Sequence, residues 1–130
     1  SARVEQVFLD YFASQGLATG PTEFDGRSDY FAFINNGIPA GGLFTGAEGI
    51  KTPGEAAVYG GTAGIAYDPC YHQACDTIDN LSEDALDQMS DAIAHSTLTF
   101  AQTTAAINGT AQGGGNGTID FEMKGNRAIK

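Results

Sequence analysis

The residues best suited to chemistry stand together in DPCYHQACDT, residues 68–77, where one of the two histidines lies between the only two cysteines. Cys70, His72 and Cys75 could be three ligands of a compact zinc site, although structural zinc sites usually use paired knuckles and a fourth ligand. A cysteine nucleophile with His72 as its base is a second interpretation, but such pairs normally come from distant positions. The cysteines could also close a turn with a surface histidine, or hold His72 as a ligand. Spacing alone leaves these alternatives open.

A second candidate group is acidic. Asp84, Asp87 and Asp91 recur at i, i+3 and i+7 on one face of an expected helix, with no lysine or arginine nearby. Like charges at helical spacing repel one another unless a cation or a partner compensates them. This face is therefore either solvated or the site of a bound cation.

The composition limits the class of protein. With 130 residues, 42% of them hydrophobic, the chain has the size of one domain or of a piece of one. Sixteen acidic residues against six basic ones give a formal charge of -10, so nucleic acid is not an expected partner. No apolar run approaches the ~20 residues that span a bilayer, so no membrane partner is expected. The acidity fits a soluble protein that is secreted into an oxidising, extracellular compartment.

The elements that must position these residues alternate in type over the first part of the chain. Apolar residues at helical spacing predict a helix over residues 2–15. Residues 17–24 are expected to end in a short strand, and Ser28 to cap a helix over residues 29–36. Residues 38–46 are predicted to form a short buried strand. This order indicates an α/β fold.

The second part of the chain is predicted to be a loop followed by a long helix. Residues 45–69 are rich in glycine and are expected to form a surface excursion that returns at residues 65–67. Ser82 is expected to cap a helix that continues to Asn108. The inner stripe predicted for this helix consists of Leu86, Met89, Ile93, Thr97 and Phe100. The remaining residues, 109–130, are predicted to be a glycine-rich linker and tail.

Three ordered motifs give the chain a family resemblance. They are GRSDYFAFINNGIPAGGLFTG at 26–46, YHQACDT at 71–77 and ALDQMSDAIAH at 85–95. Together they resemble the secreted bacterial dizinc aminopeptidases of the zinc-exopeptidase family, which act as leucine-type aminopeptidases. The resemblance implies part of a three-layer α/β/α sandwich with a mixed central sheet. It also implies two zinc ions that share a carboxylate and a water, with a glutamate as base for attack on the peptide bond.

The resemblance assigns roles to residues of this chain. It implies that His72 is the last zinc ligand, that Tyr71 donates a hydrogen bond to the tetrahedral oxyanion, and that Cys70 and Cys75 form a disulfide around the histidine. Arg27 matches an arginine beside the amino-terminal end of the substrate; its plain alternative is an ordinary salt bridge.

The same resemblance assigns three further residues. Phe44 matches the lining of an apolar side-chain pocket, and its plain alternative is a core residue. Asp87 and Asp91 match two aspartates that bind calcium in some of these enzymes. Together these roles imply release of large apolar, leucine-like residues from the amino terminus of peptides.

The chain also departs from the family pattern. Tyr30 stands where the SDH motif commonly has histidine, and the other ligands of the family, a His-x-Asp pair, a Glu-Glu pair and a further Asp, lie upstream of the matching region. Residues 1–108 therefore resemble the carboxy-terminal half of a catalytic domain, which is expected to be inactive without its upstream half, whether that is a second chain or a removed segment. The alternative is a noncatalytic calcium-binding module of the same fold, with a structural or interaction role.

Overall fold

The computed structural model describes residues 1–108 of the chain. The predicted linker and tail, residues 109–130, lie outside this range. The described elements are five α-helices and one 3₁₀ helix: α1 (Ala2–Ser14), α2 (Tyr30–Asn35), α3 (Pro53–Tyr59), η1 (Ile78–Asn80), α4 (Glu83–Gln102) and α5 (Ala105–Asn108). None of these helices is long and apolar enough to cross a membrane.

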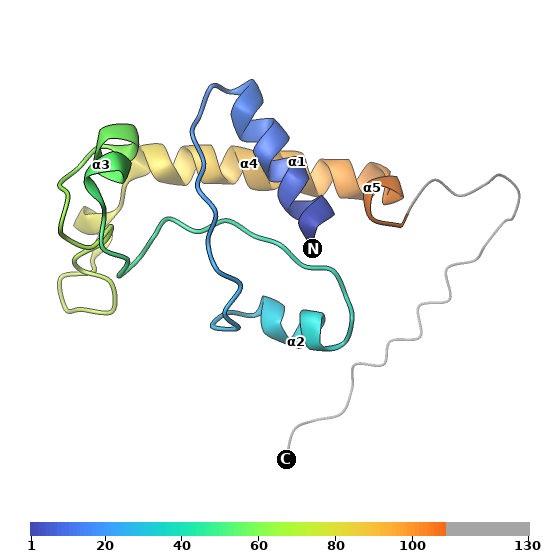
Figure 1. The fold of residues 1–130 in the computed structure, drawn as a ribbon, viewed down its shortest axis with the longest axis horizontal. Helices are drawn as coiled ribbons and strands as arrows, with labels where there is room; N and C mark the ends of the chain where they lie inside the picture. Colours follow the sequence, from blue (N-terminus) through green and yellow to red (C-terminus); the bar gives the residue numbers. More distant parts are fainter. Residues whose placement is uncertain (109–130) are drawn as a thin grey trace, which may run out of the picture.

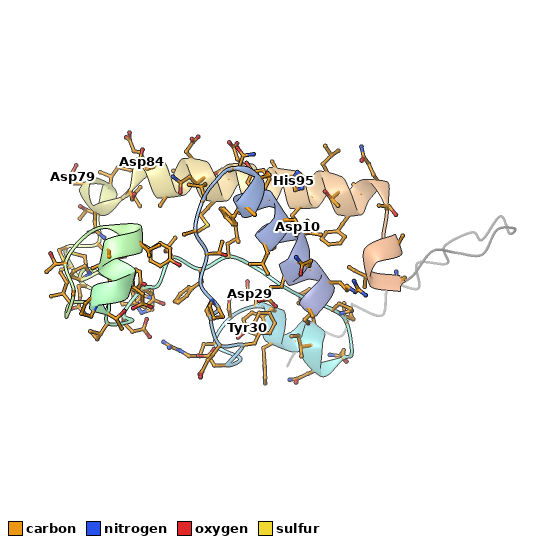
Figure 2. The ribbon with its side chains drawn as sticks, turned by 45° about the horizontal axis from the view of Figure 1, so that its top comes forward. Asp10, Asp29, Tyr30, Asp79, Asp84 and His95 are labelled. Carbon is orange, nitrogen blue, oxygen red and sulfur yellow. A yellow bond between two sulfur atoms is a disulfide. The ribbon has the colours of Figure 1, made fainter. Side chains whose placement is uncertain are left out.

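Helix α4 is the longest element, and α1 crosses it near its middle (Figure 1). The Ser82 hydroxyl accepts a hydrogen bond from the Ala85 N–H at the start of α4, as the sequence predicts. Phe12 of α1 is buried, and so are the small residues Ala92 and Ser96 of α4. Small residues on α4 let the larger side chains of α1 approach closely. The ring of Tyr11 lies 4.9 Å from that of His95 at this crossing, where Figure 2 shows His95.

Only part of the predicted inner stripe of α4 packs in the described part of the chain, where Met89 and Phe100 are half-buried. Leu86 is 60% exposed and Ile93 is 53% exposed, whereas Ala92 is fully buried. Side-chain hydrophobicity predicts the stripe. The face of α4 that packs is the one whose small residues leave room for the side chains of α1. The helix also ends earlier than predicted, because Thr103 takes an extended conformation and a separate short helix, α5, follows.

The strands predicted for residues 17–24 and 38–46 do not form within the described residues. The β structure of this region is one isolated antiparallel bridge, between Ile50 and Ala66. A strand exists only where a neighbour accepts its backbone hydrogen bonds, and these segments have no such neighbour among residues 1–108. The described residues are mostly helical, and the mixed sheet of a three-layer sandwich stays a prediction.

Helix α3 lies inside the segment that was predicted to be an open excursion. The Thr52 hydroxyl accepts a hydrogen bond from the Glu55 N–H, and the Glu55 carboxylate accepts one from the Thr52 N–H at 2.7 Å. This reciprocal pair is a capping box, and Pro53 occupies the first turn, where a missing N–H costs nothing. The sequence TPGE carries this signal, but the glycines around it favour a loop.

The excursion returns at residues 65–67, as the sequence predicts. The Lys51 N–H donates to the Ile65 carbonyl, and the Gly64 N–H donates to the Lys51 carbonyl. The side chain of Lys51 is buried, donates to the Gly60 carbonyl at 3.0 Å and lies 4.8 Å from the centre of the Tyr67 ring. These contacts fix the place at which the chain enters the cysteine loop.

Gly46 offers a test of this return. Its φ is +103°, and an added Cβ would collide with the Tyr67 ring. We expect Gly46→Ala to lower the free energy of unfolding by about 3 kcal/mol, from backbone strain and overpacking together. Gly37→Ala is the matched control, because Gly37 also has a positive φ but open space around it. Denaturant unfolding of both variants measures the difference, and equal losses would contradict the packing at Gly46.

Candidate active-site loop

The cysteine loop is closed by a disulfide. Cys70 and Cys75 are bonded, with their Cα atoms 5.3 Å apart, as the family resemblance implied. Within the loop the Gln73 N–H donates to the Cys70 carbonyl, and the Thr77 N–H donates to the Cys75 carbonyl. Sulfurs joined to each other cannot serve as thiolate ligands or as a nucleophile. The compact cysteine zinc site and the cysteine hydrolase are therefore wrong for this structure.

Asp68 anchors the base of the loop, a role that the sequence analysis missed. Its carboxylate accepts hydrogen bonds from the Cys70 N–H and from the Asn80 side-chain amide, both at 2.9 Å. The same amide lies 3.3 Å from the Asp76 carboxylate. The first contact is an Asx-type turn, which an aspartate two residues before Cys70 could have signalled. Asn80 ties both ends of the loop together.

Tyr71 and His72 stand side by side on this loop. Their ring centroids are 3.8 Å apart and their planes are inclined by 22°, so the rings stack. His72 has a φ of +57°, an uncommon conformation for a residue with a side chain. The His72 side chain is exposed and Tyr71 is half-buried. The loop therefore presents an accessible imidazole whose direction is restricted by the stacked phenol.

Arg27 lies far from the disulfide loop in the sequence. It makes an ordinary salt bridge, which was the alternative to its predicted place beside the substrate. Its guanidinium lies 2.6 Å from the Glu48 carboxylate and 4.0 Å from that of Asp25. The hydrogen bond and the charge of Glu48 raise the pKa of Arg27, and Asp25 and Tyr71 add smaller effects in the same direction. This contact does not exclude the substrate-binding role, because Arg27 stays largely exposed.

Glu48 is the ion-pair partner of Arg27. Hydrogen bonds from its own backbone N–H and from Arg27 lower the pKa of the Glu48 carboxyl, and the positive charge of Arg27 acts in the same direction. The Ala47 carbonyl, beside Glu48, accepts a hydrogen bond from the Asp68 N–H, so the Arg27 ion pair lies next to the segment that enters the disulfide loop. The sequence analysis did not single out Glu48.

Tyr30, the departure from the family's histidine, has a local structural role. Its hydroxyl accepts a hydrogen bond from the Gly26 N–H at 2.7 Å and lies 3.3 Å from the Asp25 carboxylate, to which it donates. Its ring stacks on Phe24 at 3.9 Å. These contacts close the turn that carries Arg27, at the start of α2, where Figure 2 shows Tyr30.

Phe44 is not a core residue of the described part of the chain, since its side chain is 55% exposed. An open, shallow depression lies beside Arg27, but Phe44 does not line it; its lining consists of Gly26, Arg27, Ser28, Asp29, Phe31 and Ala32. The predicted apolar side-chain pocket is therefore not formed by these residues alone.

The described residues do not contain a complete metal site. No group of three or more His, Cys, Asp or Glu side chains converges among residues 1–108. The donor chemistry of His72 fits one zinc ligand, because its imidazole is exposed and available to a metal. Asp87 and Asp91 are exposed on α4, one turn apart, and could supply two oxygens of a calcium site. Asp84 points outward from the start of the same helix (Figure 2).

The disulfide can be tested by chemistry on the protein that contains this chain. We expect the peptide with Cys70 and Cys75 to resist alkylation in the denatured, unreduced protein and to take up two labels after reduction, because a disulfide has no thiol to react. Peptide mass mapping before and after reduction makes the measurement. Two labels without reduction would contradict the structure.

Comparisons with known proteins place most of the described residues in one peptidase family. Residues 2–97 match the model of peptidase family M28. An aminopeptidase from Pseudomonas aeruginosa is 51% identical over 108 residues, which are 83% of this chain and 20% of that protein. A probable leucine aminopeptidase 2 from Aspergillus oryzae is 51% identical over 107 residues, or 82% of this chain and 22% of that protein.

A leucine aminopeptidase 2 from Trichophyton equinum is 48% identical over 103 residues, which are 79% of this chain and 21% of that protein. The chain thus spans about a fifth of the length of these curated relatives. The family match covers most of the described residues, including both the Arg27 turn and the disulfide loop. By this match, the chain belongs to peptidase family M28.

Proposed function

We propose that the protein containing this chain is a zinc-dependent aminopeptidase, and that this chain supplies its Tyr71–His72 loop and part of its substrate-binding surface. The observation that carries the proposal is the disulfide loop, which presents an exposed His72 stacked on Tyr71. Family membership supports a peptidase, and the relatives named aminopeptidase and leucine aminopeptidase support action at the amino terminus. No observation on the described residues favours the noncatalytic calcium-binding module.

His72 and Tyr71 have complementary tasks in this proposal. His72 would hold one zinc ion through its imidazole, and the remaining ligands of a two-zinc site would come from outside the described residues. When bound, the zinc supplies Lewis-acid polarisation of the peptide carbonyl and a water activated for attack. The Tyr71 hydroxyl would donate a hydrogen bond to the carbonyl oxygen as negative charge develops on it. Stacking of the two rings keeps the donor beside the ligand.

The substrate would approach along the Arg27 turn. Two carboxylates, Glu48 and Asp25, face one guanidinium there, so this cluster is negative overall and suits a free, positively charged amino terminus. Phe44 is exposed and apolar, and would contact a large apolar side chain such as leucine. The preference for leucine also has the support of the names of two of the relatives.

The rest of the catalytic domain would complete both the fold and the site. Residues 17–24 and 38–46 would then gain hydrogen-bonding neighbours and join a mixed sheet in a three-layer α/β/α sandwich. The exposed apolar side chains of α4, Leu86 and Ile93, would be covered in such an arrangement. Secretion is proposed with it, since disulfides persist in oxidising compartments.

The role of the loop can be tested in the complete enzyme. We expect His72→Ala to abolish turnover of leucyl substrates and to release zinc, because it removes a metal ligand. Tyr71→Phe should keep the zinc and lower kcat by roughly 10²–10³, the usual loss for one oxyanion donor. Steady-state kinetics and metal analysis make the measurements, and chelation should stop the wild-type enzyme until zinc is restored.

His95→Ala is the matched control for the loop variants, because it removes the chain's other histidine, which packs against Tyr11. This variant should keep its zinc and its turnover. Full activity and full zinc content after His72→Ala would contradict the proposed site.

Calcium binding at α4 is a separate expectation. Calcium takes 6–8 oxygen ligands, so Asp87 and Asp91 would need further oxygens from other segments and from water. We expect calcium to raise the Tm of the protein, and Asp87→Asn to remove that increase. Asp84→Asn is the control, because Asp84 lies on the same helix but outside the matched pair. A Tm that calcium leaves unchanged in wild type and in Asp87→Asn alike would show that the face is only solvated.

A further inference from the structure

Glu48 lies on a tight turn that is attached to the base of the disulfide loop. The Gly49 N–H donates to the Gly46 carbonyl at 2.8 Å and closes the turn. The carbonyl of Ala47 accepts a hydrogen bond from the Asp68 N–H at 2.8 Å, and the carbonyl of Gly49 accepts one from the Tyr67 N–H at 2.9 Å. The residues on either side of Glu48 are thus held by the chain that enters the loop.

The backbone of this turn is unusual in a way that fixes Glu48. Gly46 has a φ of +103° and Ala47 has a φ of +40°. Ala47 is also one of the few buried apolar residues of the described chain, with 6% of its surface exposed. A buried residue in a rarely populated conformation persists only when its surroundings hold it there. The turn therefore fixes the backbone position from which the Glu48 side chain extends.

From this turn the Glu48 side chain reaches a segment 21 residues earlier in the sequence. Its Oε1 lies 2.6 Å from Nη2 of Arg27. The side chains of Arg27 and Glu48 are 66% and 49% exposed, and exposed ion pairs contribute little to stability because water and salt screen them. This ion pair therefore adds little to the stability of the fold. Its main effect is to fix the direction of the Arg27 guanidinium, since a charged hydrogen bond is directional.

We propose that Glu48 is a positioning residue that holds Arg27 in register with the Tyr71–His72 loop. This proposal rests on the proposed function, because Arg27 is taken to face the amino-terminal end of a peptide. One side of Glu48 is fixed to the loop through Ala47 and the Asp68 N–H, and the other holds the guanidinium. A movement of the loop is thereby coupled to a movement of Arg27.

Glu48 has a second effect, on the charge that a substrate meets. An arginine without a partner would repel the ammonium group of a free amino terminus. With Glu48 at 2.6 Å and Asp25 at 4.0 Å the cluster is negative overall. Removal of the Glu48 charge leaves the charge of Arg27 less neutralised and so weakens binding of a free amino terminus, without touching the group that polarises the peptide bond. The expected defect is in KM and not in kcat.

The complete, zinc-loaded enzyme provides the test, with leucyl peptide as substrate. Glu48→Gln should raise KM roughly tenfold, leave kcat within about twofold, and keep the zinc content. If Glu48 acts through Arg27, the double variant with Arg27→Gln should lose no more than Arg27→Gln alone, because coupled residues are not additive. Glu23→Gln is the matched control, since Glu23 is exposed and its carboxylate makes no hydrogen bond or ion pair among residues 1–108.

Several results would overturn the proposal: an unchanged KM in Glu48→Gln, losses that multiply in the double variant, or loss of zinc from Glu48→Gln. A crystallographic comparison separates this failure from failure of the proposed function. The guanidinium of Arg27 should move in Glu48→Gln and stay in place in Glu23→Gln, whether or not the protein turns over leucyl peptides. An inactive wild-type enzyme would reject the function, and an Arg27 that does not move would reject the role of Glu48.

Discussion

The hydrogen-bonded return of residues 46–68 is the constraint on which the candidate site depends. Two glycine-rich stretches meet there through backbone hydrogen bonds, with the buried side chain of Lys51 between them. Because Asp68 takes part in this return and also accepts the Cys70 N–H, the disulfide loop begins at a fixed point. The disulfide then limits only the last step, the direction of Tyr71 and His72. Without the return, the bridged loop would be rigid in itself but free to move as a unit.

Part of the fold could be predicted because its signals are local. A helix start such as Ser82, or a helix end before Gly16, depends on hydrogen bonds within a few residues, and both agree with the structure. The capping box of Thr52 and Glu55 is equally local, but the glycines around it suggested a loop. Strands and the packed face of α4 depend on distant neighbours, and the hydrophobicity of Leu86 or Ile93 does not say which neighbour arrives.

The candidate site divides in the same way. The disulfide and the Tyr71–His72 pair could be expected from the resemblance, since they lie within one short motif. Glu48 could not, because its importance comes from an ion pair across 21 residues and from the hydrogen bonds that its neighbours Ala47 and Gly49 accept from Asp68 and Tyr67. A glutamate on a glycine-rich loop carries no sequence signal of that kind. Asp68 is intermediate, because its turn is local but its bond to Asn80 is not.

Positively charged residues are scarce in this chain, and this scarcity makes their contacts with the return of residues 46–68 important. Between Arg3 and Lys124 the chain has only two lysines or arginines, Arg27 and Lys51, whereas the whole sequence contains sixteen acidic residues. Both cations contact the same return: Lys51 from within, through the Gly60 carbonyl and the Tyr67 ring, and Arg27 from outside, through Glu48. In so acidic a chain each cation has many carboxylates to attract it, so its partner is decided by backbone geometry and not by charge alone. The return supplies that geometry, and for this reason the stability of the segment and the placement of the candidate site depend on the same few hydrogen bonds.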